Sequence, residues 1–235
     1  MKHYIFHGDN HVESRGALTS LITQMQGRGF EVVKLDGAVT TKPDLLTAAK
    51  SQMLISLGQL VVVENLLSLN KKGGEIFGEV GEELQKPYLV GSGTVFVFWE
   101  KKSISPASLK SLSQGFFVRE FKVPVLVFKF LDSVYPKNTR YVLKMLEDVQ
   151  RAVAPEFLLI MLSRQVRLLI WVKCDPDTLK VPGWQKTKLI TQAEKFTVDQ
   201  LFSLHNKLLE LDRAQKHSQL PEDLPSSLAL LALSV

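Results

Sequence analysis

One apolar run constrains the fold of this chain more than any other stretch. It is Leu60–Val63, and Glu64 and Asn65 follow it. Three of its four residues are β-branched, a composition that favours a strand. Because the run has no polar face, it is typical of a strand buried on both sides, as in a parallel sheet covered by helices. The sequence therefore predicts an α/β sheet with this run as its central strand.

Strand patterns and helix patterns alternate along the first half of the chain. The expected strands are 3–7, 30–35, 60–63, 94–99 and 116–121, and the helices between them lie at about 11–27, 41–52, 75–85 and 105–113. This alternation predicts an open parallel sheet with helices on both faces.

No strand pattern remains after Lys122. The expected helices cover about 125–133, 138–153, 155–173, 182–195, 198–215 and 225–235. We therefore expect two domains: an α/β domain at 1–122 and an all-α bundle at 123–235.

Composition narrows the class of protein. Hydrophobic residues make up 45% of the 235 residues, which is ample for packed cores. No apolar run reaches the roughly 18–20 residues that a membrane helix needs, and the amino terminus does not read as a signal peptide. The single cysteine, Cys174, fits a reducing cytoplasm. The net charge of +5 is compatible with a nucleic-acid partner and does not require one.

Four acidic residues are expected where the predicted strands end, because they directly follow the apolar runs: Asp9, Asp36, Glu64 and Glu100. The carboxyl ends of parallel strands are where such sheets bind ligands. Clustered carboxylates there could hold a divalent ion for phosphate chemistry. Acidic residues in these turns are also ordinary helix caps, and we expect no metal site.

The turn after the first strand lacks the phosphate-binding loop of a nucleotide-hydrolysing sheet. It reads GDNHVESRG over 8–16, with no lysine to reach the phosphates and no following hydroxyl for Mg²⁺. Asp9 and Glu13 would repel a triphosphate at the helix amino terminus. We therefore expect no ATP hydrolysis in this turn and no catalytic residue.

Two further features are candidates for contact with a partner. The basic pairs Lys71-Lys72 and Lys101-Lys102 fall in loops at one edge of the sheet and could touch phosphate or DNA, although solvation is their commoner role. The apolar cluster Met53-Leu54-Ile55 lies in the connection just before the central strand, where apolar side chains often serve a partner.

Several motifs, in order along the chain, resemble the delta subunit of the bacterial DNA polymerase III clamp loader. They are YIFHGD at 4–9, LVVVEN at 60–65, LSRQVRLL at 162–169 with Lys173, KLITQAEKF at 188–196 and LLELDRAQK at 208–216. The resemblance implies an ATPase-like sheet of AAA+/P-loop type that has lost its phosphate loop, followed by a helical collar.

The resemblance also implies site residues. Hydrophobic residues before the central strand bind the sliding clamp in that family, and their equivalents here are Met53, Leu54 and Ile55, with Leu57 nearby. The family usually has an aromatic or Leu-Phe pair there and then a basic residue, whereas this chain has Leu54-Ile55 and Gln59. The collar helix carries the expected subunit-interface residues, which are Arg164, Gln165, Arg167 and Lys173. The small helical domain that the family has between sheet and collar is expected to be missing.

The function that the resemblance implies is mechanical. The chain would bind the beta sliding clamp, help open its ring, and assemble with gamma/tau and delta-prime type subunits that use ATP, near primer–template DNA in the bacterial cytoplasm. No cofactor and no catalysis of its own are expected. Two alternatives stay open: a Mg²⁺-dependent phosphate-processing enzyme using Asp9, Asp36 and Glu64, and a scaffold that joins an assembly through the collar alone.

Overall fold

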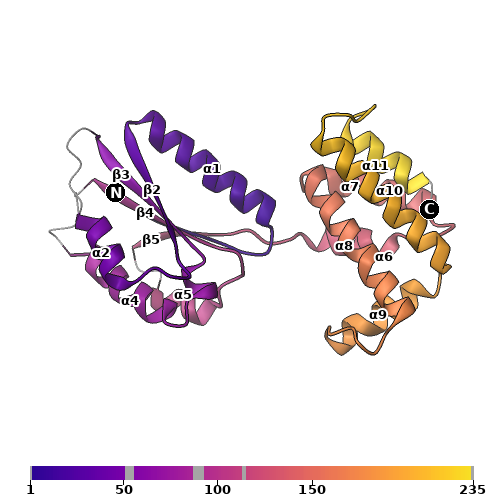
Figure 1. The fold of residues 1–235 in the computed structure, drawn as a ribbon, viewed down its shortest axis with the longest axis horizontal. Helices are drawn as coiled ribbons and strands as arrows, with labels where there is room; N and C mark the ends of the chain where they lie inside the picture. The colour runs from indigo at the N-terminus through magenta and orange to yellow at the C-terminus, as the bar shows by residue number, and fades with distance from the viewer. Residues whose placement is uncertain (1, 51–55, 87–92, 113–114, 234–235) are drawn as a thin grey trace. The chain divides into compact units, whose positions relative to one another are not determined.

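The chain divides into two compact units, Met1–Val123 and Pro124–Val235. The structure is a computed structural model, and it describes residues 2–50, 56–86, 93–112 and 115–233. The first unit is α/β and the second is helical (Figure 1). The predicted fold class, a parallel α/β sheet followed by an all-α unit, is confirmed.

Among the described residues of the first unit, five parallel strands form a sheet in the order β2-β3-β4-β1-β5. They are β1 (His3–His7), β2 (Phe30–Asp36), β3 (Gly58–Glu64), β4 (Thr94–Glu100) and β5 (Phe116–Glu120). The first strand therefore lies between the fourth and the fifth.

The prediction that Leu60–Val63 is the central strand is wrong in one respect. This run is β3 and is fully buried, as expected. The middle of the five strands, however, is β4, all seven residues of which are buried. Both strands are interior and both read as apolar runs, so local composition does not distinguish their places in the sheet.

Helices cover both faces of the sheet, and the strand period of two decides which side chains meet them. Helix α1 (His11–Gly27) packs on the face that carries Leu60 and Val62. Helices α2 (Lys42–Lys50) and α4 (Gly73–Leu84) pack on the opposite face, with Val61 and Val63. Figure 1 shows α1 on one side of the sheet and α2, α4 and α5 (Pro106–Leu112) on the other.

Six helices form the second unit in the part of the chain that the structure describes, and α8 packs against α6, α9, α10 and α11. They are α6 (Val125–Ser133), α7 (Thr139–Gln150), α8 (Pro155–Cys174), α9 (Gly183–Ala193), α10 (Val198–Lys216) and α11 (Leu224–Leu233). Thr197 begins α10 with a capping box, in which its side chain and that of Gln200 each accept the other's backbone N–H.

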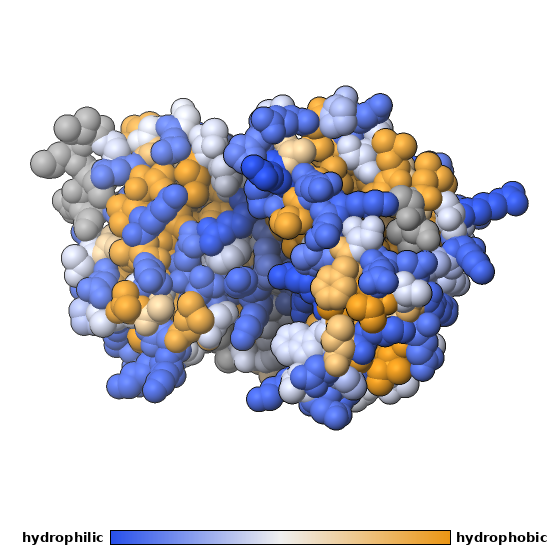
Figure 2. All heavy atoms as spheres, turned by 45° about the vertical axis from the view of Figure 1, so that its right-hand side comes forward, coloured by the Kyte–Doolittle hydropathy of each residue, from blue (hydrophilic) through white to orange (hydrophobic). Residues whose placement is uncertain are grey.

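Only residues 121–124 separate β5 from α6, so no further helical domain lies between the two units. No helix in the described ranges is both long enough and apolar enough to span a bilayer. Figure 2 shows hydrophobic side chains on the surface of both units, interrupted by hydrophilic ones.

Candidate functional site

The turn between β1 and α1 is closed by the chain segment that follows β5. Gly8 has φ +126°, and a Cβ on it would lie 2.3 Å from the carbonyl oxygen of Phe121. The Phe121 carbonyl accepts the backbone N–H of Asn10 at 3.0 Å, and the Phe121 N–H donates to the carbonyl of His7 at 2.8 Å. The Asn10 side chain accepts the N–H of Glu13. Two backbone donors at this end of α1, those of Asn10 and Glu13, are therefore bound within the chain.

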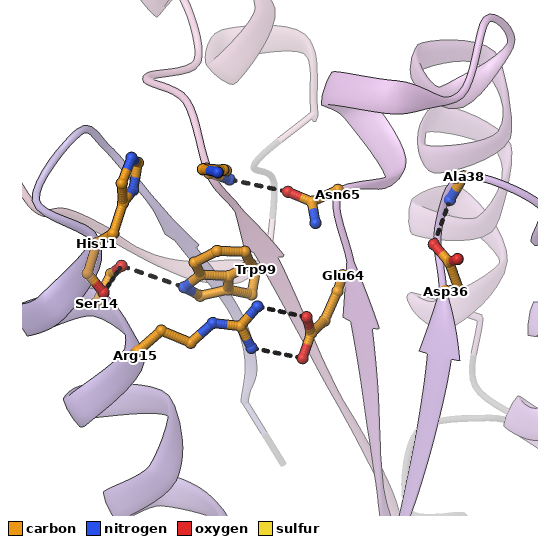
Figure 3. Close-up of polar contacts among 9 residues, drawn as sticks. His11, Ser14, Arg15, Asp36, Ala38, Glu64, Asn65 and Trp99 are labelled. Atoms are coloured by element: carbon orange, nitrogen blue, oxygen red, sulfur yellow. Dashed lines mark hydrogen bonds and ion pairs between the residues drawn. The ribbon is translucent and has the colours of Figure 1, made fainter. Parts of the chain in front are cut away.

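Beside this turn lies a group of four side chains that we call the Arg15 cluster: Ser14, Arg15, Glu64 and Trp99 (Figure 3). The Arg15 guanidinium donates to both carboxylate oxygens of Glu64, at 2.6 and 2.5 Å. It also lies 3.7 Å from the ring centroid of Trp99, whose indole N–H donates to Ser14 Oγ at 3.2 Å. The hydrogen bonds from Arg15 hold the pKa of the Glu64 carboxyl below its usual value. The cluster thus joins α1, β3 and β4 at the carboxyl edge of the sheet.

The acidic residues at this edge do not share a site. Glu100 is buried and its carboxylate accepts the N–H groups of Leu67 and Ser68, at 2.8 and 3.0 Å, so it caps the short helix α3 (Leu66–Leu69). Burial raises the pKa of the Glu100 carboxyl, and this effect outweighs that of the hydrogen bonds, which lower it. Asp36 accepts a backbone N–H of its own turn, and Asp9 is exposed. Across the described ranges no three His, Cys, Asp or Glu side chains are placed to hold a metal ion.

Two histidines of β1, the half-buried His3 and the buried His7, act as hydrogen-bond acceptors in the scaffold. His3 Nδ1 accepts the N–H of Phe96 at 3.1 Å, and His7 Nδ1 accepts that of Ile104 at 3.2 Å. Burial lowers the pKa of His3 to about 4 and also lowers the pKa of His7. Both rings are therefore neutral at neutral pH and hold the backbone of β4 and of the loop after it.

Of the residues expected to bind the clamp, Met53, Leu54 and Ile55 lie outside the described residues. Leu57 is described, and its side chain is 79% exposed although it directly precedes the buried strand β3. Its backbone N–H donates to the carbonyl of Gly29 at 3.1 Å, which fixes it at the amino edge of the sheet. An apolar side chain is thus held in solvent at a fixed backbone position.

The four lysines expected near phosphate all have exposed side chains; they are Lys71, Lys72, Lys101 and Lys102. Their two loops are neighbours, because the Lys101 N–H donates to Asn65 Oδ1, at the start of the segment that leads to the other pair. None of the four ammonium groups has an ion pair to any residue in the described ranges. Four positive charges therefore face solvent on the carboxyl side of β3 and β4.

The four residues expected at a subunit interface divide into two pairs. Gln165 Nε2 donates to Gln192 Oε1 at 2.7 Å, and Lys173 Nζ donates to the carbonyl of Ala193 at 2.9 Å, so these two side chains hold the end of α9 against α8. Arg164 and Arg167 lie three residues apart on one exposed face of α8, without an ion pair in the part of the chain that the structure describes.

The Arg15 cluster was not anticipated from the sequence. Arg15 and Glu64 are 49 residues apart, and Ser14 and Trp99 are 85 apart, so no local pattern links them. A usable signal was present for Arg15 itself, since an arginine stands within the segment where a phosphate loop would place its lysine and hydroxyl residues.

Two solved structures resemble this chain along nearly its whole length. The DNA clamp loader delta protein of Bacillus subtilis is 16% identical, with a TM-score of 0.49, and the alignment covers 99% of this chain and 94% of that one. A DNA polymerase III gamma subunit-related protein of Thermotoga maritima is 15% identical, with a TM-score of 0.36 and coverage of 99% and 93%. No protein-family model and no curated protein matches the chain.

Proposed function

We propose that this protein is a clamp-loader subunit of the delta type, which binds a sliding clamp and helps to open its ring. The proposal is supported by motifs in family order along the chain and by an α/β sheet followed directly by a helical unit. The observation that carries it is Leu57, an apolar side chain held 79% exposed immediately before a strand whose first six residues are buried.

The exposed leucine is suited to anchoring a partner. Burying one aliphatic side chain of this size contributes roughly 1.5–3 kcal/mol before ordering costs. Met53, Leu54 and Ile55 belong to the same proposed anchor, and together they would form a hot spot rather than a whole interface. Opening a ring requires more than affinity, because the anchor must fit the open clamp better than the closed one.

The proposed role leaves ATP to partner subunits. In this chain the turn that would cradle phosphates is closed by Phe121, and the Arg15 guanidinium is neutralised by Glu64. The alternative of a Mg²⁺-dependent phosphate enzyme has less support, since Glu64 is engaged by Arg15 and Asp36 by its own turn. The exposed pairs Lys71-Lys72 and Lys101-Lys102 are the proposed contacts to DNA phosphates.

The helical unit is proposed to join the partner subunits. Arg164 and Arg167 are exposed on one face of α8 and have no ion pair with any described residue, and arginine is well suited to bidentate contacts with carboxylates. Gln165 and Lys173, which hold α9, contribute indirectly by fixing the shape of that face.

Leu57→Asp tests the clamp contact. Because the Leu57 side chain is exposed, the substitution leaves the sheet folded. It should weaken binding to the sliding clamp of the same organism at least about tenfold, because a charge then takes the place of two methyl groups that are buried in the complex. Binding is measured by surface plasmon resonance with the full chain.

The matched control is Val39→Asp, because Val39 is 76% exposed and lies in the loop after β2, at the other edge of the sheet. It should bind the clamp as the unchanged protein does. Equal binding by all three proteins, or no clamp binding by the unchanged chain, would remove the proposal.

A further inference from the structure

A groove of about 380 Å³ opens between α6, α8 and α9 of the helical unit. Leu131 and Leu189 lie in its lining as buried residues, and Phe128 and Trp184 line it with side chains that are 47% and 68% exposed. Its size falls within the range of sites that hold ligands. Two large aromatic side chains that line the same hollow and remain in solvent are typical of a surface that a partner covers.

The charge at the groove is positive and concentrated on one residue. Lys188 Nζ lies 3.2 Å from Asp132 Oδ2, so these two lining residues neutralise each other. Arg164 also lines the groove, is exposed, and has no ion pair in the described ranges. A guanidinium in this setting is complementary to a carboxylate, which it can bind through two parallel hydrogen bonds.

We propose that this groove binds a short peptide segment of a partner protein, one that carries a carboxylate next to at least two apolar side chains. The carboxylate would meet Arg164, and the apolar side chains would lie between Phe128 and Trp184. The inference rests on the proposed function for the expectation that the helical unit meets a partner. The groove is then the place on the helical unit where that partner binds.

The lining favours a peptide over other ligands. A metabolite site has polar groups that converge inside the pocket, whereas here the charged groups Arg164, Asp132 and Lys188 are exposed. A nucleic acid would bring phosphates onto Phe128 and Leu131, which cannot bind them, and onto the carboxylate of Asp132, which would repel them.

The test uses the full chain and a phage-displayed library of random short peptides. Selected peptides should share an acidic residue beside aliphatic or aromatic ones. Arg164→Glu and Phe128→Ala should each weaken the binding of a selected, fluorescently labelled peptide at least about tenfold, as measured by fluorescence anisotropy. Exchanging the peptide's acidic residue for lysine should restore binding to Arg164→Glu.

Two substitutions serve as matched controls and should bind the peptide unchanged. Arg140→Glu reverses an exposed arginine on α7, and Phe202→Ala removes an aromatic ring of α10 that is 47% exposed, as Phe128 is. Selected peptides without a carboxylate, or full binding by Arg164→Glu, would overturn the proposal.

Self-association of the chain that Phe128→Ala abolishes in sedimentation would also overturn it, since a second copy would then be the occupant. A failure of Leu57→Asp to affect clamp binding leaves the groove proposal standing, because that residue belongs to the other unit.

Discussion

At the scale of single residues, the turn after β1 shows why this sheet presents no phosphate loop. Gly8 has a φ of +126°, which L side chains rarely adopt, and it faces the Phe121 backbone at a distance that leaves no room for a Cβ. The Phe121 carbonyl then takes the Asn10 N–H that such a loop would offer to an anion. One glycine therefore permits both the tight turn and its closure.

Gly8→Ala should destabilise the sheet unit by about 2–6 kcal/mol, because strain in the left-handed region and overlap with the Phe121 carbonyl each cost about 1–3 kcal/mol. Urea unfolding followed by Trp99 fluorescence, with Trp171 and Trp184 replaced by Phe, measures the change. Gly16→Ala is the matched control. Gly16 lies within α1 with open space around it, so the substitution should stabilise by about 0.5–1 kcal/mol. Equal effects of the two substitutions would contradict the closed turn.

At the scale of elements, patterns of residues predict most helices and strands, whereas contacts distant in sequence stay hidden. The runs that became β3 and β4 and the cap at Thr197 were predictable, because strand composition and helix capping act over a few residues. Helix α3 has four residues, too few to show a period, and the carboxylate that caps it comes from Glu100 on another strand.

The four expected subunit-interface residues show the same difference between local and distant information. The helical period of 3.6 places Arg164 and Arg167 on a different face of α8 from the other two, so this separation could have been predicted from the sequence. The hydrogen bonds of Gln165 and Lys173 could not have been predicted, because their partners lie on another helix, α9. The strand order, with β4 in the middle, depends on how connections cross the sheet, which no local pattern records.

The Arg15–Glu64 pair should couple α1 to β3 measurably. A double-mutant cycle of Arg15→Met and Glu64→Gln is expected to give a coupling of about 0.5–1.5 kcal/mol at neutral pH and low salt, since the contact is bidentate but partly exposed. The exposed pair Lys216–Asp212 on α10 is the control and should give about 0.3–0.5 kcal/mol.

The coupling free energy between Arg15 and Glu64 should also depend on pH. The folded pKa of Glu64 lies below its ordinary value of 4.5, so the unfolded chain binds the proton more readily. The stabilisation is therefore fully present above pH 4.5 and is lost as the pH falls through the folded pKa. A coupling that stays constant down to full protonation would show that the ion pair does not join these two elements.

At the scale of the whole molecule, the two units have separate roles in the proposed function. The sheet unit has its own two apolar clusters, one on each face, and it contains Leu57 and the four exposed lysines. The helical unit contains α8 with Arg164 and the groove. Cutting between Val123 and Pro124 keeps Phe121, which the β1–α1 turn needs, with the sheet.

Fragments 1–123 and 124–235 should therefore fold when produced separately, each with a cooperative thermal transition in circular dichroism. The sheet fragment should bind the sliding clamp, and lose that binding with Leu57→Asp, while the helical fragment should bind the selected acidic peptide. The expected affinities lie within about threefold of those of the full chain, because no proposed contact crosses the cut. Clamp binding by the helical fragment would show that the clamp anchor does not lie in the sheet unit, as proposed, but in the helical unit. Loss of both activities from two well-folded fragments would show that the sites depend on both units together.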